Sequence, residues 1–370
     1  MKKINLIVLF LLAIVLVACS NESKLPPLES AEDCNEKSLE GGWVCVWADE
    51  FEGTEVDLTK WTYEVNGYGG GNGELQYYTA DNTVVENSIL SIIAKKEVYL
   101  GKQYTSSRIV SKYKGDWTYG RFIIRAKNPV GGGTWPAIWM MPTMNVYGGW
   151  PKSGEIDIME YVGNNPTKVS GTVHTEIRNG GNTPVREYTL PTANSAFHNY
   201  EVIWEPGAIR WYVDGVKFNE VIYTPQFTQQ YKYNQVFPFD QNFFMILNLA
   251  IGGTLGGNVD DSIFPTAFEV DYVRVYQRDY GQIDKDAPSK VTDISLQQLA
   301  NTIYWKRAED DFGVEKYNIY IDGEFRGVSR VNQFTFGGLT KGQTYSIRIE
   351  AVDFRGRVSK QSEPFSFTFQ

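Results

Sequence analysis

The stretch GEIDIMEYV, residues 154–162, decides the fold because it combines the composition of a β-strand with three acids. Glu155 and Asp157 alternate with isoleucines, so the two-residue period of a strand places both carboxylates on one face. The same period would place the next acid at residue 159, but that residue is Met and the acid follows at Glu160. A β-bulge at Ile158–Met159 adds one residue to the strand and returns Glu160 to the face of the other two acids.

Three acids on one face suit glycoside hydrolysis, which needs one ionised and one protonated carboxyl group across the scissile bond. A neighbouring negative charge raises the pKa of the carboxyl that stays protonated. The Cα atoms of Glu155 and Glu160 would lie about 13 Å apart at ~3.3 Å per residue, so both side chains must lean inward on a concave strand. A solvated strand face with ordinary surface acids is the alternative, and composition alone leaves both interpretations open.

Composition limits the classes of function. The chain has 370 residues, which is enough for one large or two modest domains. Its formal charge of −9 argues against nucleic acid as a partner. Aromatic residues make up 14% with ten Trp, which suggests β-rich cores or rings used as binding platforms. The two histidines, His174 and His198, are far apart, and no Cys/His spacing indicates a zinc site.

The central part of the chain predicts an all-β domain. From Trp43 to about Gln277, short apolar or alternating runs such as SILSIIA (88–94) are separated by Gly, Asn, Asp and Pro clusters. Asp214-Gly215 lies between two such runs and predicts a two-residue hairpin. No sustained helical period is present. The pattern favours a sandwich or barrel, which can exceed 200 residues as one domain.

The N-terminus predicts a targeting segment, with Lys2 and Lys3 before an apolar run that ends LVAC at Cys19. This ending resembles a bacterial lipobox, which implies a signal peptide at residues 1–18 and lipid on Cys19. An ordinary secretory peptide is the alternative. Residues 19–42 are expected to form a tether to the bacterial cell envelope, with the outer membrane as the expected location. In such an oxidising compartment Cys34 and Cys45 could pair.

The C-terminal part predicts a second, smaller unit after the polar hinge at 284–288. Residues 286–370 resemble a fibronectin type III module of seven short strands. An Asp322-Gly323 turn and a tyrosine at position 345, where that module has its tyrosine corner, support the resemblance. No chemistry is expected there, and a spacer or a weak partner site are its two candidate roles.

The central domain, residues 43–279, resembles glycoside hydrolase family 16 in its laminarinase-like, bulged form. Beside GEIDIMEYVG, seven motifs in sequence carry the resemblance: ADEF (48–51), ELQYYT (74–79), GTWPAIW (133–139), GTVH (171–174), FHNY (197–200), LNLAIGG (247–253) and VDYVRVY (270–276). The resemblance implies a two-sheet β-jelly-roll sandwich of the concanavalin A-like kind, with a concave substrate cleft.

The resemblance also implies the roles of the three acids. Glu155 matches the nucleophile, Glu160 the general acid/base, and Asp157 the assisting carboxylate that orients the nucleophile. The implied reaction is hydrolysis of an internal β-glycosidic bond with retention and without a cofactor.

Six further positions match residues that contact sugar in this family: Trp135, Trp139, His174, Arg108, Asn72 and Asn248. For the tryptophans and for His174, a place in the core is the alternative. His198 is expected to serve packing. The family often binds a structural calcium ion, for which Asp271 matches the acidic ligand and Glu52 is a second candidate; a surface acid is the alternative.

The flanks of the acid motif favour β-1,3-glucan (laminarin) or mixed-linkage β-1,3/1,4-glucan as the polysaccharide partner, and a monomer is expected. Two alternatives stay open: a related hydrolase of agar, porphyran or carrageenan, and a surface lipoprotein that binds glycans without turnover. Two loops depart from the family pattern. Gly252-Gly253 is followed by TLGG where many laminarinase-like sequences have Trp-Pro, and Gly73 stands where related sequences often have Asn. Both departures concern the outer sugar-binding subsites.

Overall fold

The computed structural model describes residue 34 and residues 42–205, 207–222, 233–278, 286–297, 301–310, 314–329, 332–353 and 356–369. The predicted signal peptide, Cys19 and most of the tether lie outside these residues, so lipidation stays a prediction. Among the described residues, none of the helices has the length and apolar character needed to span a bilayer. Cys34 and Cys45 form a disulfide with their Cα atoms 5.7 Å apart, which confirms that these two residues pair.

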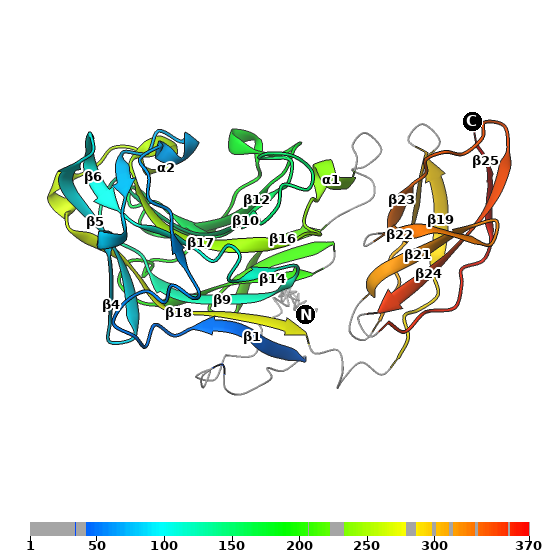
Figure 1. The fold of residues 1–370 in the computed structure, drawn as a ribbon, viewed down its shortest axis with the longest axis horizontal. Coiled ribbons are helices and arrows are strands. Elements are labelled where there is room, and N and C mark those ends of the chain that lie inside the picture. The colour runs from blue at the N-terminus through cyan, green and yellow to red at the C-terminus, as the bar shows by residue number, and fades with distance from the viewer. Residues whose placement is uncertain are drawn as a thin grey trace, which may run out of the picture.

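The N-terminal unit consists of two sheets packed face to face (Figure 1). The first sheet has the order β16-β15-β14-β9-β18-β5-β6-β3, with β1 beside β18 and β4 beside β5. Its strands are β1 (Trp43–Asp49), β3 (Gln76–Tyr78), β4 (Thr83–Glu86), β5 (Ile89–Tyr99), β6 (Lys102–Ser106), β9 (Gly120–Lys127), β14 (His198–Glu205), β15 (Ala208–Val213), β16 (Val216–Ile222) and β18 (Thr266–Arg278).

The second sheet carries the acid motif and has the order β13-β12-β11-β10-β17-β7-β2, with β8 beside β17. Its strands are β2 (Thr62–Tyr63), β7 (Arg108–Val110), β8 (Asp116–Trp117), β10 (Thr134–Pro142), β11 (Glu155–Tyr161), β12 (Lys168–His174), β13 (Arg186–Thr189) and β17 (Phe243–Ile251). Two single-turn helices, α1 (Tyr233–Val236) and α2 (Gly253–Gly256), lie in connections. Short 3-10 turns occur at Gly69–Gly71, Ala80–Asn82, Gly180–Asn182 and Asp261–Ile263.

Apolar residues from both sheets form the core between them. In β17 the residues Phe243, Met245 and Leu247 belong to this core, and the intervening residues face the opposite side of the sheet. Burial of each such large side chain stabilises the fold by about 1.5–3 kcal/mol. The all-β sandwich predicted from the alternating runs is therefore confirmed.

The hairpin predicted at Asp214-Gly215 is also confirmed. Val213 pairs with Val216 across the turn between β15 and β16. Both turn residues have positive φ, 47° for Asp214 and 78° for Gly215, as a type I′ turn requires.

The C-terminal unit has a core of its own, which includes Trp305, Tyr317 and Ile347. One sheet has the order β19-β20-β23 and the other the order β22-β21-β24-β25. The strands are β19 (Thr292–Gln297), β20 (Thr302–Lys306), β21 (Val314–Ile321), β22 (Glu324–Ser329), β23 (Gln333–Thr335), β24 (Thr344–Asp353) and β25 (Phe365–Thr368). The Tyr345 hydroxyl accepts a hydrogen bond from the Thr340 backbone N–H at 2.9 Å, as a tyrosine corner does. Membership of the fibronectin type III class stays a prediction.

Candidate active site

A bulge in β11 brings the three acids onto one face. Against β10, Ala137 pairs with Glu160 and Trp139 pairs with Asp157, so two residues of β11, Ile158 and Met159, stand opposite one residue of β10. The register against β12 shifts at the same place. Ile158 and Met159 are both buried in the core, and this double apolar step returns Glu160 to the face of Asp157. The predicted bulge is therefore present.

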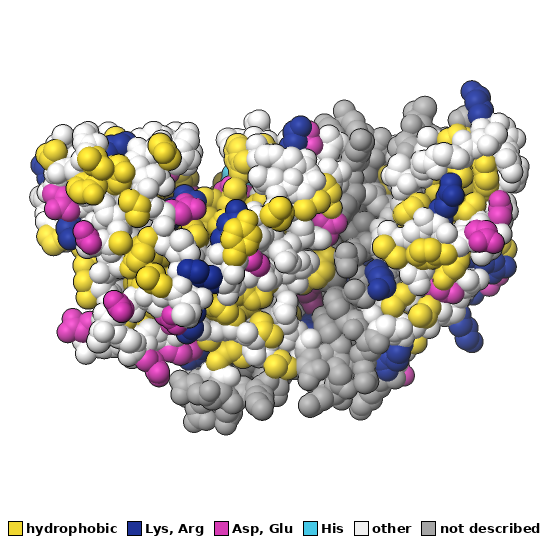
Figure 2. Space-filling model, viewed as in Figure 1, with side chains coloured by type: hydrophobic (Ala, Val, Ile, Leu, Met, Phe, Trp, Pro, Cys, Tyr) yellow, Lys and Arg dark blue, Asp and Glu magenta, His cyan; other side chains and the backbone are white. Residues whose placement is uncertain are grey.

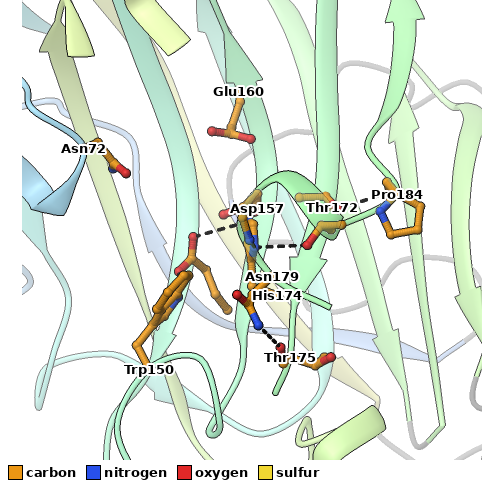
Figure 3. Close-up of polar contacts among 12 residues, drawn as sticks. Asn72, Trp150, Asp157, Glu160, Thr172, His174, Thr175, Asn179 and Pro184 are labelled. Atoms are coloured by element: carbon orange, nitrogen blue, oxygen red, sulfur yellow. Dashed lines mark hydrogen bonds and ion pairs between the residues drawn. The ribbon is translucent and has the colours of Figure 1, made fainter. Parts of the chain in front are cut away.

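Glu155, Asp157 and His174 form a compact cluster, and Glu160 lies farther along β11 from Asp157 and His174 (Figure 3). One side-chain atom from each of Glu155, Asp157 and His174 lies within 4.8 Å of the others. Asp157 thus lies beside Glu155 on one face of β11, and its negative charge adds to burial in raising the pKa of Glu155.

Burial governs the protonation of this cluster. It is the largest cause that raises the pKa of Glu155, with the Asp157 carboxylate second, whereas His174 and the Trp150 hydrogen bond act in the opposite direction. Burial, followed by the charge of Glu160, raises the pKa of Asp157. Burial also raises the pKa of Glu160, against a hydrogen bond from Trp135. The cluster therefore retains protons at pH values where exposed acids are ionised, as a general acid requires.

The surroundings of His174 define its tautomer. The Gly180 backbone N–H donates to His174 Nδ1 at 3.2 Å, so the neutral ring carries its proton on Nε2. His174 Nε2 lies 3.2 Å from Asp157 Oδ2 and 3.9 Å from Glu155 Oε1. The structure therefore brings Nε2 of His174 close to the carboxyl groups of Asp157 and Glu155.

The two tryptophans of β10 lie on the same face as the acids. Trp135 Nε1 donates to Glu160 Oε1 at 3.2 Å. Trp139 Nε1 donates to Asn248 Oδ1 at 2.7 Å, and the Arg108 guanidinium lies 4.9 Å from the centre of the Trp139 ring. Five of the six positions expected to bind sugar, all except Asn72, are thus in contact with the acids or with one another.

Asn72 belongs to the opposite wall of the site. Its amide is directed toward Asp157 and Glu160 in Figure 3 and donates to Glu74 Oε1 at 3.4 Å. Figure 2 shows a groove that opens at the top of the N-terminal unit, beside the part that carries α2 and β6 in Figure 1. The sequence therefore anticipated which residues meet at this groove, although their contacts with sugar stay a prediction.

Trp150 is a site residue that the sequence analysis missed. It is half exposed, its Nε1 donates to Glu155 Oε2 at 2.5 Å, and its ring centre lies 6.0 Å from that of His174. The available signal was a Trp-Pro pair only five residues before Glu155. A residue in a loop follows no strand or helix period, so the sequence could not predict which way the Trp150 side chain points.

The two candidate calcium ligands are not grouped with other acids. The Asp271 carboxylate pairs with Arg125, while Glu52 is exposed on a loop after β1. Within the described part of the chain, these residues belong to no group of three or more possible metal ligands, and calcium binding stays a prediction. His198, expected to serve packing, is hydrogen-bonded through Nδ1 to Asp214 at 2.7 Å.

Comparisons with known proteins agree on one family. The sequence model of Glycosyl hydrolases family 16 matches residues 71–256. The chain is 47% identical over 249 residues to the beta-glucanase of Rhodothermus marinus, covering 64% of this chain and 85% of that protein. It is 39% identical over 255 residues to the glucan endo-1,3-beta-glucosidase of Cryptopygus antarcticus, covering 63% and 92%. The X-ray structure of the Rhodothermus marinus laminarinase superposes with a TM-score of 0.62 at 47% identity, covering 64% of this chain and 98% of that one.

Proposed function

Because the chain belongs to family 16 of the glycosyl hydrolases, and so is a glycoside hydrolase, we propose that it cuts internal bonds of β-1,3-glucan or mixed-linkage β-1,3/1,4-glucan. Its similarity to proteins named beta-glucanase and glucan endo-1,3-beta-glucosidase supports this substrate class. The observation that carries the proposal is the bulge of β11, which places Glu160 on the face of Glu155 and Asp157.

In the proposed mechanism, Glu155 attacks the anomeric carbon while Glu160 protonates the leaving glycosidic oxygen. A covalent glycosyl–enzyme intermediate forms, and the first product leaves. Glu160, now ionised, takes a proton from water, and the resulting hydroxide displaces Glu155 from the sugar. Two displacements at one carbon retain its configuration. Glu160 carries its proton again at the end, so the cycle closes.

The neighbours of the acids support this division of roles. Trp150 and His174 both favour the ionised form of Glu155, which is the form that attacks. Burial raises the pKa of Asp157, so this residue can hold a proton beside the nucleophile. Burial of Glu160 keeps its proton available for the leaving group.

Replacement of the nucleophile is the direct test. Glu155→Gly should abolish hydrolysis of laminarin, and added azide should restore turnover and yield a glycosyl azide of inverted configuration. Glu155→Gln should still bind the glucan. Full hydrolytic activity of either variant would refute the assigned nucleophile.

Substrate panels separate the alternatives. Release of reducing sugar from laminarin and barley β-glucan, with none from agarose, is expected. Activity on agarose alone would replace the glucan proposal by the galactan alternative. Binding of laminarin without any turnover would support the glycan-binding alternative.

The position of the chain in the cell is a further proposal, supported by the sequence LVAC before the tether. Cys19 would carry lipid and hold the enzyme at the bacterial cell envelope, with the outer membrane as the expected location. Metabolic labelling with a palmitate analogue should mark the full-length chain and not a Cys19→Ala variant.

A further inference from the structure

Glu74 lies at the end of the loop that carries Asn72. Its carboxylate is buried among neutral hydrogen-bond donors, which the sequence did not predict. Glu74 is 7% exposed, and no ion pair involves its side chain among the residues that the structure describes. Its carboxylate instead accepts hydrogen bonds from three neutral groups: Gln76 Nε2 at 2.7 Å, Tyr78 Oη at 3.1 Å and Asn72 Nδ2 at 3.4 Å. A buried carboxylate without a cation is costly unless such donors surround it.

The polypeptide around Glu74 is shaped to accept this carboxylate. A Cβ atom on Gly70 would lie 2.1 Å from Glu74 Oε1, and Gly70 has a φ of +58°. The turn at 69–71 therefore closes onto the carboxylate only because residue 70 has no side chain. The glycine at position 70 of this Gly-rich loop is therefore explained by the space that the Glu74 carboxylate occupies.

Glu74 also lies where two segments of the cleft wall meet. We call residues 69–73 and 252–257 together the Gly-rich wall. Glu74 forms a bridge with Gly252, and the Thr254 N–H donates to the Asn72 carbonyl at 2.9 Å. The Leu75 N–H donates to the Ile251 carbonyl at 2.9 Å. A shift of Glu74 would therefore displace both segments of the wall.

A chain of hydrogen bonds links Glu74 to Trp139 of β10 and Asn248 of β17, which we call the floor of the cleft. Trp139 Nε1 can only donate, and it donates to Asn248 Oδ1 at 2.7 Å. This fixes the amide of Asn248, whose Nδ2 then donates to Tyr78 Oη at 3.1 Å. The Tyr78 hydroxyl donates its own hydrogen bond to Glu74, so every bond in the chain points toward the carboxylate. Both oxygens of the carboxylate are used, since Oε2 accepts from Tyr78 and Gln76 and Oε1 accepts from Asn72. An amide at this position would turn an NH₂ group toward at least one of these donors.

From this arrangement we infer that Glu74 is a positioning residue for substrate, which holds Asn72 and the Asn248–Trp139 pair in one fixed relation across the groove. The inference rests on the proposed function, since it concerns sugar units bound between the Gly-rich wall and the floor. Glu74 does not face the reacting atoms; it acts through the residues that it orders.

The test is Glu74→Gln, which keeps the shape of the side chain and places an NH₂ group against donors. On laminari-oligosaccharides long enough to reach the wall, KM should rise about tenfold, as expected when a charged hydrogen-bond acceptor is lost. The value of kcat should stay within about twofold, because the chemical step is not touched. Glu86→Gln, an exposed acid on β4 of the other sheet, is the charge-matched control and should leave both constants unchanged.

Direct binding separates this inference from the proposed function. Titration calorimetry should show that the double variant Glu155→Gln/Glu74→Gln binds laminari-oligosaccharides about tenfold more weakly than Glu155→Gln alone. Should Glu74→Gln lower the folded fraction, Tyr78→Phe removes one hydroxyl from the chain and should still raise KM about threefold. Unchanged KM and affinity in these variants, or an equal loss of kcat on all substrates, overturns the inference. Failure of the unsubstituted enzyme to hydrolyse laminarin refutes the proposed function itself.

Discussion

Trp150 shows how a single side chain outside the acid motif can influence the charge of the proposed nucleophile. Its N–H group donates to Glu155 Oε2 at 2.5 Å and lowers the pKa of that carboxyl, against the larger effect of burial. The other oxygen, Oε1, lies on the side of His174, 3.9 Å from Nε2. The indole therefore favours the ionised form of Glu155.

Trp150→Phe should remove this donor while keeping an aromatic ring. Loss of a hydrogen bond to a charged group should lower kcat/KM by about tenfold. The pKa of Glu155 should rise, and since Glu155 attacks in its ionised form, the acidic limb of the kcat/KM profile should move to higher pH. Steady-state kinetics across the acidic range checks both effects. Trp139→Phe also loses an indole N–H group in this cleft, but its partner is Asn248, so it should weaken binding without moving the acidic limb.

Glu160 gives a prediction for stability. Burial raises its pKa above 4.5 in the folded protein, so the folded state prefers the protonated form. As pH rises through the interval between the unfolded and the folded pKa, the folded state loses stability relative to the unfolded chain. Glu160→Gln, which cannot ionise, should therefore be more stable than the parent by about 1 kcal/mol at neutral pH.

Thermal unfolding of both proteins at two pH values measures this difference. Below pH 4.5 the parent carries a neutral side chain as well, so the difference should vanish there. A Gln variant that is less stable than the parent at neutral pH would contradict the assigned direction.

At the scale of the element, the bulge of β11 absorbs one additional residue and so keeps Glu160 on the face of the other two acids. Deletion of Ile158 should restore regular alternation and leave Glu160 on that face, because Met159 alone then separates it from Asp157. The value of kcat should therefore fall by less than about tenfold. Hydrolysis of laminarin by the deletion variant measures this change.

Ile158→Val is the matched control, because it keeps the bulge and removes one buried methylene at a site that is 2% exposed. It should cost about 0.5–1.5 kcal/mol of stability and leave kcat nearly unchanged. A folded deletion variant that loses more than about a hundredfold in kcat relative to this control would show that the bulge does more than return Glu160 to the face of Asp157.

The strands and the bulge could be predicted because their signals are local. Alternation of apolar and polar residues predicted the strands, and Asp214-Gly215 predicted a hairpin. The spacing of three residues from Asp157 to Glu160, instead of two, predicted the extra residue in β11. Glu74 and Trp150 could not be assigned in this way. The role of Glu74 depends on segments about 170 residues apart, joined by the bond between Tyr78 and Asn248, and that of Trp150 depends on the path of a loop. Such contacts are set by tertiary packing, and the pattern of apolar and polar residues along the sequence does not predict them.

At the scale of the molecule, the two units have separate cores. The buried cluster of the N-terminal unit and that of the C-terminal unit share no residue, as in domains that fold independently. The last strand of the N-terminal unit, β18, ends at Arg278, whose side chain pairs with Glu205 and lies over Trp43 within that unit. The cleft and its walls are built from the N-terminal unit alone.

A chain that ends after Arg278 should therefore fold and hydrolyse soluble laminarin with kcat/KM within about twofold of the full chain. The related laminarinase structure points the same way, since 98% of that chain is covered by 64% of this one. Calorimetry and steady-state kinetics of both forms test the expectation. A loss of activity beyond about tenfold would show that the C-terminal unit supports the active site.

The two adjacent core residues of β11, Ile158 and Met159, have a consequence for laboratory evolution. The same irregularity that turns an acid toward the groove leaves buried carboxyl groups that weaken the fold at neutral pH. Selection for heat resistance alone would favour clones in which these acids are neutralised, and would enrich stable proteins without turnover. A library built on this enzyme must therefore be screened for sugar release from the first round.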